Sequence, residues 1–170
     1  IQGYFDSIPH DRLMQLIERK IADGRVLSLL RRYLEMDIFD GLKQWTPEEG
    51  TPQGAIISPL LSNIYLDPLD DRMAEQGFRM VRYADDFIVL TDSPGKAEAA
   101  LAEIREWMDE AGLTLHPEKT RIVDATRKGG FDFLGYHFER GMKWARRRSV
   151  KRLREKLKPL TQRNNGHSME

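Results

Sequence analysis

Two adjacent carboxylates, Asp85 and Asp86, lie in the segment VRYADDFIVL, whose other side chains are mostly apolar. Burying an unpaired carboxylate costs several kcal/mol, so the pair must be neutralised or lie where the chain leaves the core. Carboxylate oxygens suit a hard cation such as Mg²⁺, and two ions about 3.5–4 Å apart can stabilise phosphoryl transfer. An acidic turn that binds no metal is the alternative, and the Asp-Asp pair alone favours it.

The flanking residues predict how this pair is positioned. Residues 78–83 and 87–91 are rich in Val, Ile, Phe and Tyr, which indicates two strands around a tight turn at 84–86. Because hairpins expose their turns at one edge of a sheet, we expect both carboxylates at the rim and not in the core.

The remaining patterns predict a strand end at 1–5 and a loop at 113–123 that leads into a strand. Asp6 or Ser7 would cap the first helix, Ser58 the third and Ser93 the fourth. The second helix would turn Val26, Leu29, Leu30 and Leu34 inward. The expected helices are 6–21, 25–39, 58–76, 93–112 and a basic one at 149–163, with a hairpin at 131–140. This order predicts an α+β fold in which helices cover one face of an antiparallel sheet.

Composition and charge narrow the class of protein. The 170 residues are 40% hydrophobic and 32% charged, as in a globular domain, and no apolar run could span a membrane. With no cysteine, disulfides and thiolate metal sites are excluded, and a cytoplasmic setting fits. Residues 1–139 have a net charge of −9, whereas 140–163 have +10. The basic segment is either a contact for a phosphate backbone or a solvated helix face.

Four motifs in order identify a resemblance: GTPQGAIISPLLSNIYLDPLD at 50–70, YADD at 83–86, LHPEKT at 115–120 and FDFLGYHF at 131–138. Together with GYFDSIPH at 3–10, they resemble the palm of reverse transcriptases, most closely those encoded by group II introns. The resemblance implies a polymerase palm over 1–140, without fingers, and the start of the thumb or a linker to a maturase region over 141–170.

The resemblance also implies roles for individual residues. Asp85 and Asp86 would bind two Mg²⁺ ions, with Mn²⁺ able to substitute, and Lys119 would assist departure of pyrophosphate. The residues expected to contact the nucleotide are Phe5, Gln53, Gly54, Tyr83 and Ala84, with Phe5 excluding a 2′-OH. Phe133, Leu134 and Gly135 would grip the primer. The residues expected to face the template–primer backbone are Lys151, Arg152, Arg154, Lys156 and Lys158.

Structural alternatives stay open for several of these residues. Phe5 could be a core side chain, Lys119 an exposed loop residue, and Gln53 part of a helix cap. Phe133 and Leu134 are expected to fill the core, and His137 is expected to be structural. Asp6 is expected to cap a helix, because the metal-binding Asp of this family would fall directly before Ile1. A chain lacking that ligand and the fingers should polymerise poorly.

The function implied by the resemblance is an RNA-directed DNA polymerase that joins dNTPs to a DNA primer on an RNA template and also binds intron RNA. A retron or CRISPR-associated reverse transcriptase is an alternative within the same class. A non-enzymatic RNA-binding protein of polymerase-like fold is an alternative from another class. The intact YADD argues against the latter, since a binder gains nothing from two unpaired carboxylates beside RNA.

Overall fold

The computed structural model describes residues 1–36, 38–40, 43–45, 49–51 and 56–161. The chain divides into two compact units, Ile1–Arg121 and Ile122–Glu170. Helices combined with antiparallel strands confirm the predicted α+β class, while the palm and thumb boundaries stay a prediction. No helix in these ranges is long and apolar enough to cross a membrane. The first unit contains η1 (Tyr4–Asp6), α1 (His10–Glu18), α2 (Gly24–Leu34), β1 (Ile38–Asp40), β2 (Lys43–Trp45), α3 (Ser58–Glu75), β3 (Arg79–Tyr83), β4 (Asp86–Leu90) and α4 (Pro94–Glu110).

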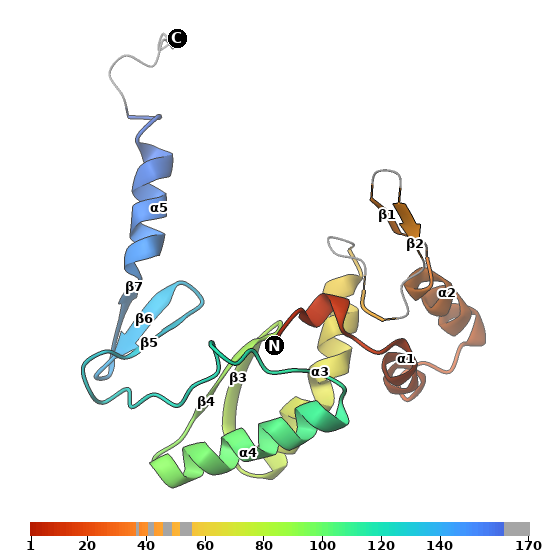
Figure 1. Cartoon of the computed structure of the whole chain (residues 1–170), viewed down its shortest axis with the longest axis horizontal. Helices are drawn as coiled ribbons and strands as arrows, with labels where there is room; N and C mark the ends of the chain where they lie inside the picture. Colours follow the sequence, from red (N-terminus) through yellow and green to blue (C-terminus); the bar gives the residue numbers. More distant parts are fainter. Residues whose placement is uncertain (37, 41–42, 46–48, 52–55, 162–170) are drawn as a thin grey trace. The chain divides into compact units, whose positions relative to one another are not determined.

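The hairpin of β3 and β4 forms as predicted, with α3 in contact with β3 and α4 in contact with β4 (Figure 1). Tyr83 pairs with Asp86, so the turn proper is Ala84 and Asp85, one residue shorter than expected. Among the described residues the hairpin is a two-stranded sheet, and Val81 and Leu90 are about half exposed on it. The helices therefore cover one face, and the turn lies at the end of the hairpin.

The core of this unit is built by the apolar faces of α1, α3 and α4. Tyr65 on α3 is fully buried, and its hydroxyl donates to the carbonyl of Ala111 beyond the end of α4. Arg72 joins the same two helices through Glu103, Glu106 and Glu110. The fully buried side chains include Ile8, Leu13, Met14, Ile17, Leu34, Leu61, Tyr65, Leu66, Leu69, Met73 and Met108. These contacts make α3 the central support of the hairpin.

The helix caps follow the sequence in part. Ser93 caps α4 by accepting from the Lys96 N–H, as predicted. The expected caps Asp6 and Ser7 are wrong, because α1 begins after Pro9 and has no side-chain cap. Ser58 is the first residue of α3 rather than its cap, which is Ile57.

The inward face of α2 is narrower than predicted. Leu30 and Leu34 are buried, but Val26 is 39% and Leu29 67% exposed. The helix packs on α1 along one side, which leaves the flank with Val26 and Leu29 uncovered.

The predicted strand at 1–5 is also wrong, because Gly3 has φ 54 and the chain turns into η1. Tyr4 is buried, and its ring centroid lies 5.7 Å from that of Phe5, so the two rings do not occupy opposite faces of a strand. The segment is fixed by distant backbone: the Thr51 N–H donates to the Phe5 carbonyl at 2.6 Å, and the Gly50 N–H to the Ile8 carbonyl at 2.7 Å.

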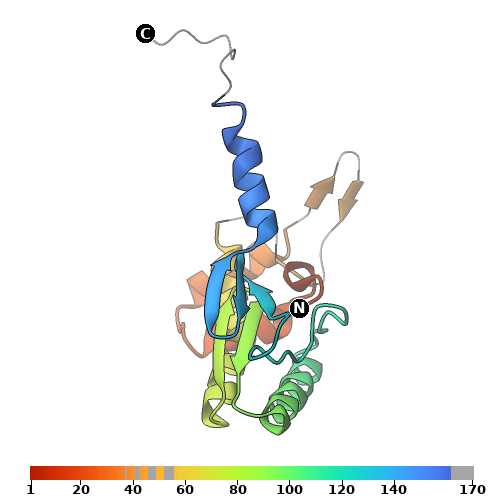
Figure 2. The same cartoon turned by 90° about the vertical axis from the view of Figure 1, so that its left-hand side faces the viewer.

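The second unit holds a three-stranded antiparallel sheet that continues into a helix (Figure 2). Its elements are β5 (Phe131–Phe133), β6 (Tyr136–Glu139), β7 (Met142–Ala145) and α5 (Arg147–Leu157). The hairpin of β5 and β6 is confirmed, β7 was not foreseen, and residues 113–123 form no strand. No residue of α5 is buried, as expected for the basic helix.

Candidate functional site

The turn between β3 and β4 presents two carboxylates that have no partner among the described residues. Asp85 is half-buried and Asp86 exposed, and neither forms a hydrogen bond or ion pair with any described residue. Such oxygens suit a hard divalent cation, which takes carboxylates and keeps water or phosphate in its remaining positions. In the described ranges no three His, Cys, Asp or Glu side chains gather around one point. The described part of the chain therefore offers Asp85 and Asp86 at this turn without a third such side chain beside them.

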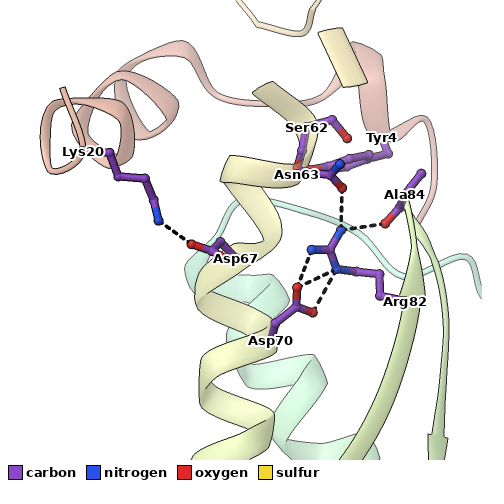
Figure 3. A network of polar contacts seen from close by, with 8 residues as sticks. All are labelled: Tyr4, Lys20, Ser62, Asn63, Asp67, Asp70, Arg82 and Ala84. Atoms are coloured by element: carbon purple, nitrogen blue, oxygen red, sulfur yellow. Dashed lines mark hydrogen bonds and ion pairs between the residues drawn. The ribbon is translucent and has the colours of Figure 1, made fainter. Parts of the chain in front are cut away.

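Arg82, on β3, connects this turn to α3 (Figure 3). Its Nε donates to both oxygens of Asp70, at 2.9 and 3.0 Å, and Nη2 also donates to Asp70. Nη1 donates to Asn63 Oδ1 at 2.9 Å and to the Ala84 carbonyl at 3.0 Å. The hydrogen bond with Asp70 raises the pKa of Arg82 above its usual value, so the guanidinium stays charged.

Tyr4 fixes η1 to the same helix. Its hydroxyl donates to the Ser62 carbonyl at 2.6 Å, and burial raises its pKa well above the usual value. One turn further along α3, Asp67 accepts from Lys20 at 2.7 Å. Because Ser62 and Asn63 are neighbours on α3, η1 and the Asp85 turn are anchored at the same level of the helix.

A hollow of about 920 Å³ lies beside the turn. Its lining includes Phe5, Tyr83 and Ala84, three of the five residues predicted to contact a nucleotide. Phe5 is partly buried against the core and also lines the hollow, and Tyr83 is 68% exposed. The expected role of Phe5 in excluding a 2′-OH stays a prediction. The structure therefore brings together residues that are about eighty positions apart in the sequence.

Of the other predicted residues in the described part of the first unit, Lys119 does not line this hollow. Gln53 and Gly54 lie outside the described residues. Lys119 is exposed in a turn after α4, where its N–H donates to the His116 carbonyl at 3.3 Å, and its ammonium pairs with no described carboxylate. Its role in the reaction stays a prediction.

In the second unit, the turn of the β5–β6 hairpin consists of Leu134 (φ 47) and Gly135 (φ 84). Leu134 is 48% exposed, so the expectation that it fills core is wrong, because the turn carries it away from the strands. Phe133 is half-buried. His137 forms a hydrogen bond with Asp132 at 2.7 Å, and its ring lies 5.0 Å from that of Trp144 with the two planes tilted by 42°, in keeping with a structural role.

The predicted phosphate-contacting residues all lie on or at the end of α5 and are exposed: Lys151, Arg152, Arg154, Lys156 and Lys158. Lys151 lies 3.9 Å from Glu155, the one acidic residue of the helix. The other basic side chains have no carboxylate partner among the described residues. The helix therefore presents a cationic surface, interrupted on one side by the exposed Leu153 and Leu157.

Sequence reasoning missed Arg82, Asp70 and Asn63. A signal was present: Asn63 and Asp70 are seven residues apart, which places both on one face of a helix. Arg82 alternates with exposed neighbours on β3 and must turn inward, where a guanidinium needs an acceptor.

Several known proteins are similar to this chain. The family described as "Reverse transcriptase (RNA-dependent DNA polymerase)" matches residues 1–138. An uncharacterized 91 kDa protein in a cob intron of Schizosaccharomyces pombe is 45% identical over 74% of this chain and 23% of its own length. Protein YkfC of Escherichia coli is 29% identical over 82% of this chain and 45% of its own length. The chain thus spans less than half the length of these relatives.

The group II intron-encoded protein LtrA of Lactococcus lactis subsp. cremoris is 43% identical over 41% of this chain and 12% of its own length. A chain in a solved structure titled "Partial Cas6-RT-Cas1--Cas2 complex" is 30% identical over 71% of this chain and 22% of that one, with a TM-score of 0.37. The predicted resemblance to group II intron reverse transcriptases is confirmed. Members of the family generally depend on a divalent metal. The chain belongs to the reverse transcriptase (RNA-dependent DNA polymerase) family.

Proposed function

We propose that this chain forms the catalytic palm of a group II intron-type RNA-directed DNA polymerase, which extends a DNA primer with dNTPs on an RNA template. The observation that carries the proposal is the Asp85–Asp86 turn, whose carboxylates have no described partner and which adjoins the hollow lined by Phe5 and Tyr83. Two unpaired carboxylates repel a polyanion, so a protein that only bound RNA would gain nothing from them.

Asp85 and Asp86 would hold Mg²⁺ at the end of the hairpin, with further ligands from water and the triphosphate. When bound, the metal supplies electrostatic stabilisation of the ionised primer hydroxyl and of the pyrophosphate. Phe5 would form one wall of the sugar site and disfavour a 2′-OH by contact. Gln53 and Gly54 would contact the nucleotide, and Lys119 would place positive charge near the departing pyrophosphate.

Residues of the second unit would bind the nucleic acid. The cationic surface of α5 would contact backbone phosphates of the template–primer without reading sequence. Leu134 and Gly135, at a left-handed turn, would contact the primer end together with Phe133. Intron RNA is the further partner that we propose for the complete protein.

The test is primer extension on poly(rA)/oligo(dT) by the complete protein with Mg²⁺. Asp85→Asn and Asp86→Asn should each lower the extension rate by about 10³-fold or more, because loss of a charged ligand removes several kcal/mol of transition-state stabilisation. Asp92→Asn is the matched control, since Asp92 lies just beyond β4 and pairs with Lys96 at the surface. Extension at the wild-type rate by both turn variants would refute the proposed site.

A further inference from the structure

All three guanidinium nitrogens of Arg82 donate hydrogen bonds, and the acceptors lie either on α3 or in the turn between β3 and β4 (Figure 3). Nε and Nη2 bind Asp70, and Nη1 divides between Asn63 at 2.9 Å and the Ala84 carbonyl at 3.0 Å. The Arg82 side chain is 11% exposed, whereas Asp70 is 37% exposed and the contact with Asn63 is open to water. One planar group therefore bridges a helix and the turn that carries Asp85.

Ala84 needs such a contact because of its backbone conformation. Its φ of 53 lies in the left-handed region, which a residue with a Cβ disfavours. The Arg82 N–H holds the Ala84 carbonyl, and the direction of that carbonyl fixes the peptide leading into Asp85. The peptide that leads into Asp85 is thus held by a side chain that is itself bound to Asp70 on α3.

The anchor on α3 is itself firmly placed. Asn63 and Asp70 are two helical turns apart on one face, and the helix between them contains the fully buried Tyr65, Leu66 and Leu69. A helix packed in this way cannot shift without disturbing the core. Because Arg82 is bound both to this helix and to the Ala84 carbonyl, it restricts movement of the turn.

We propose that Arg82 is a positioning residue for the metal-binding turn, acting through the Ala84 carbonyl with Asp70 and Asn63 as its fixed support. The inference rests on the proposed function. A lysine cannot replace Arg82, because one ammonium cannot reach Asp70, Asn63 and Ala84 in the directions that the planar fork provides. The positive charge alone is therefore insufficient.

The test compares Arg82→Lys with Arg72→Lys in the complete protein. Arg72 is the matched control because its guanidinium also binds carboxylates. It lies on α3, however, and its partners Glu103, Glu106 and Glu110 lie on α4. Two readouts are measured: Mn²⁺ binding by electron paramagnetic resonance without substrates, and the Mg²⁺ dependence of primer extension. Unfolding midpoints are recorded for both variants.

We expect Arg82→Lys to raise the half-saturating Mn²⁺ and Mg²⁺ concentrations about tenfold or more and to lower kcat, with KM for template–primer within about twofold. Arg72→Lys should leave the metal dependence within about twofold even where it lowers the unfolding midpoint. Asp70→Asn keeps the shape of the Asp70 side chain but removes its charge, and it should raise the half-saturating Mn²⁺ and Mg²⁺ concentrations about threefold. This variant replaces Arg82→Lys in the test if Arg82→Lys fails to fold.

A metal dependence of Arg82→Lys within twofold of wild type, or an equal shift in Arg72→Lys, would overturn the positioning role. The two proposals fail differently. A wild-type protein that extends no primer refutes the proposed polymerase, whereas Mn²⁺ binding still tests Arg82. Normal extension with an unchanged metal requirement in Arg82→Lys refutes only the positioning role.

Discussion

Gly50 is where a single added methyl group should damage the site from a distance. Its φ is +92, and a Cβ built there would lie 2.9 Å from the Asp6 Cα and 2.9 Å from the Phe5 carbonyl oxygen. Both atoms belong to backbone, which cannot rotate away as a side chain would. Gly50→Ala must therefore push η1, and Phe5 with it, away from the loop.

The magnitude follows from two terms. A residue with a Cβ in the left-handed region costs about 1–2 kcal/mol, and relief of overpacking against fixed atoms adds about 1–3 kcal/mol. Gly77→Ala isolates the first term, because Gly77 has φ +75 but an added Cβ would meet no atom within 4 Å. With a urea slope of about 2 kcal/mol/M, the two midpoints should differ by about 1 M, Gly50→Ala being the lower.

The assay is urea unfolding of the 170-residue chain, followed by far-ultraviolet circular dichroism. The same variant in the complete protein should weaken discrimination between dNTPs and rNTPs, because Phe5 moves with η1, whereas Gly77→Ala should not. Equal midpoints for the two variants would show that the contact between Gly50 and η1 is absent, and the reasoning would fail.

Four further predictions concern separate features. Burial raises the pKa of Tyr65 to about 12, so the unfolded chain loses this proton first, and the free energy of unfolding should fall by about 2 kcal/mol as pH rises from 10 to 12. Tyr65→Phe should flatten that fall in urea titrations at successive pH values while costing about 1 kcal/mol at neutral pH. Phe5→Val should raise kcat/KM for rNTPs relative to dNTPs about tenfold, measured by single-nucleotide extension, and an unchanged ratio would reject the gate. Arg72→Gln should lower the urea midpoint more at low salt than at high salt, since most of its carboxylate partners are exposed and screened; the same shift at both would contradict this. Changing Lys151, Arg154 and Lys158 to Gln should reduce the slope of log K against log salt for template–primer binding by about 2–3, and an unchanged slope would place the phosphate contacts elsewhere.

Local signals predicted much of the fold. The hairpin around Asp85 follows from two apolar strands interrupted by a short turn, and the start of α4 follows from Ser93 before Pro94. The exposed basic helix α5 follows from its composition. In each case the determining residues are neighbours in the sequence, so the pattern can be read without the rest of the chain.

Features set by distant partners escaped prediction. The strand expected at 1–5 gives way to η1 because Gly50 and Thr51, more than forty residues away, bond the carbonyls of Ile8 and Phe5. Leu29 fits an amphipathic pattern, yet its exposure depends on how little of α2 is covered by α1. The candidate site divides in the same way: the two carboxylates are visible in the motif, whereas Arg82 becomes visible only once α3 lies beside β3.

The two-stranded hairpin has a practical consequence for purified protein. Its outer surface exposes Val81 and Leu90, and within the described ranges each of its strands pairs on one side only. A strand edge with free amides and carbonyls beside apolar side chains is a template for another copy of itself. Concentrated samples of the chain should self-associate through this edge. Val81→Lys should keep the samples monodisperse in light scattering, and it leaves the residues of the turn unchanged.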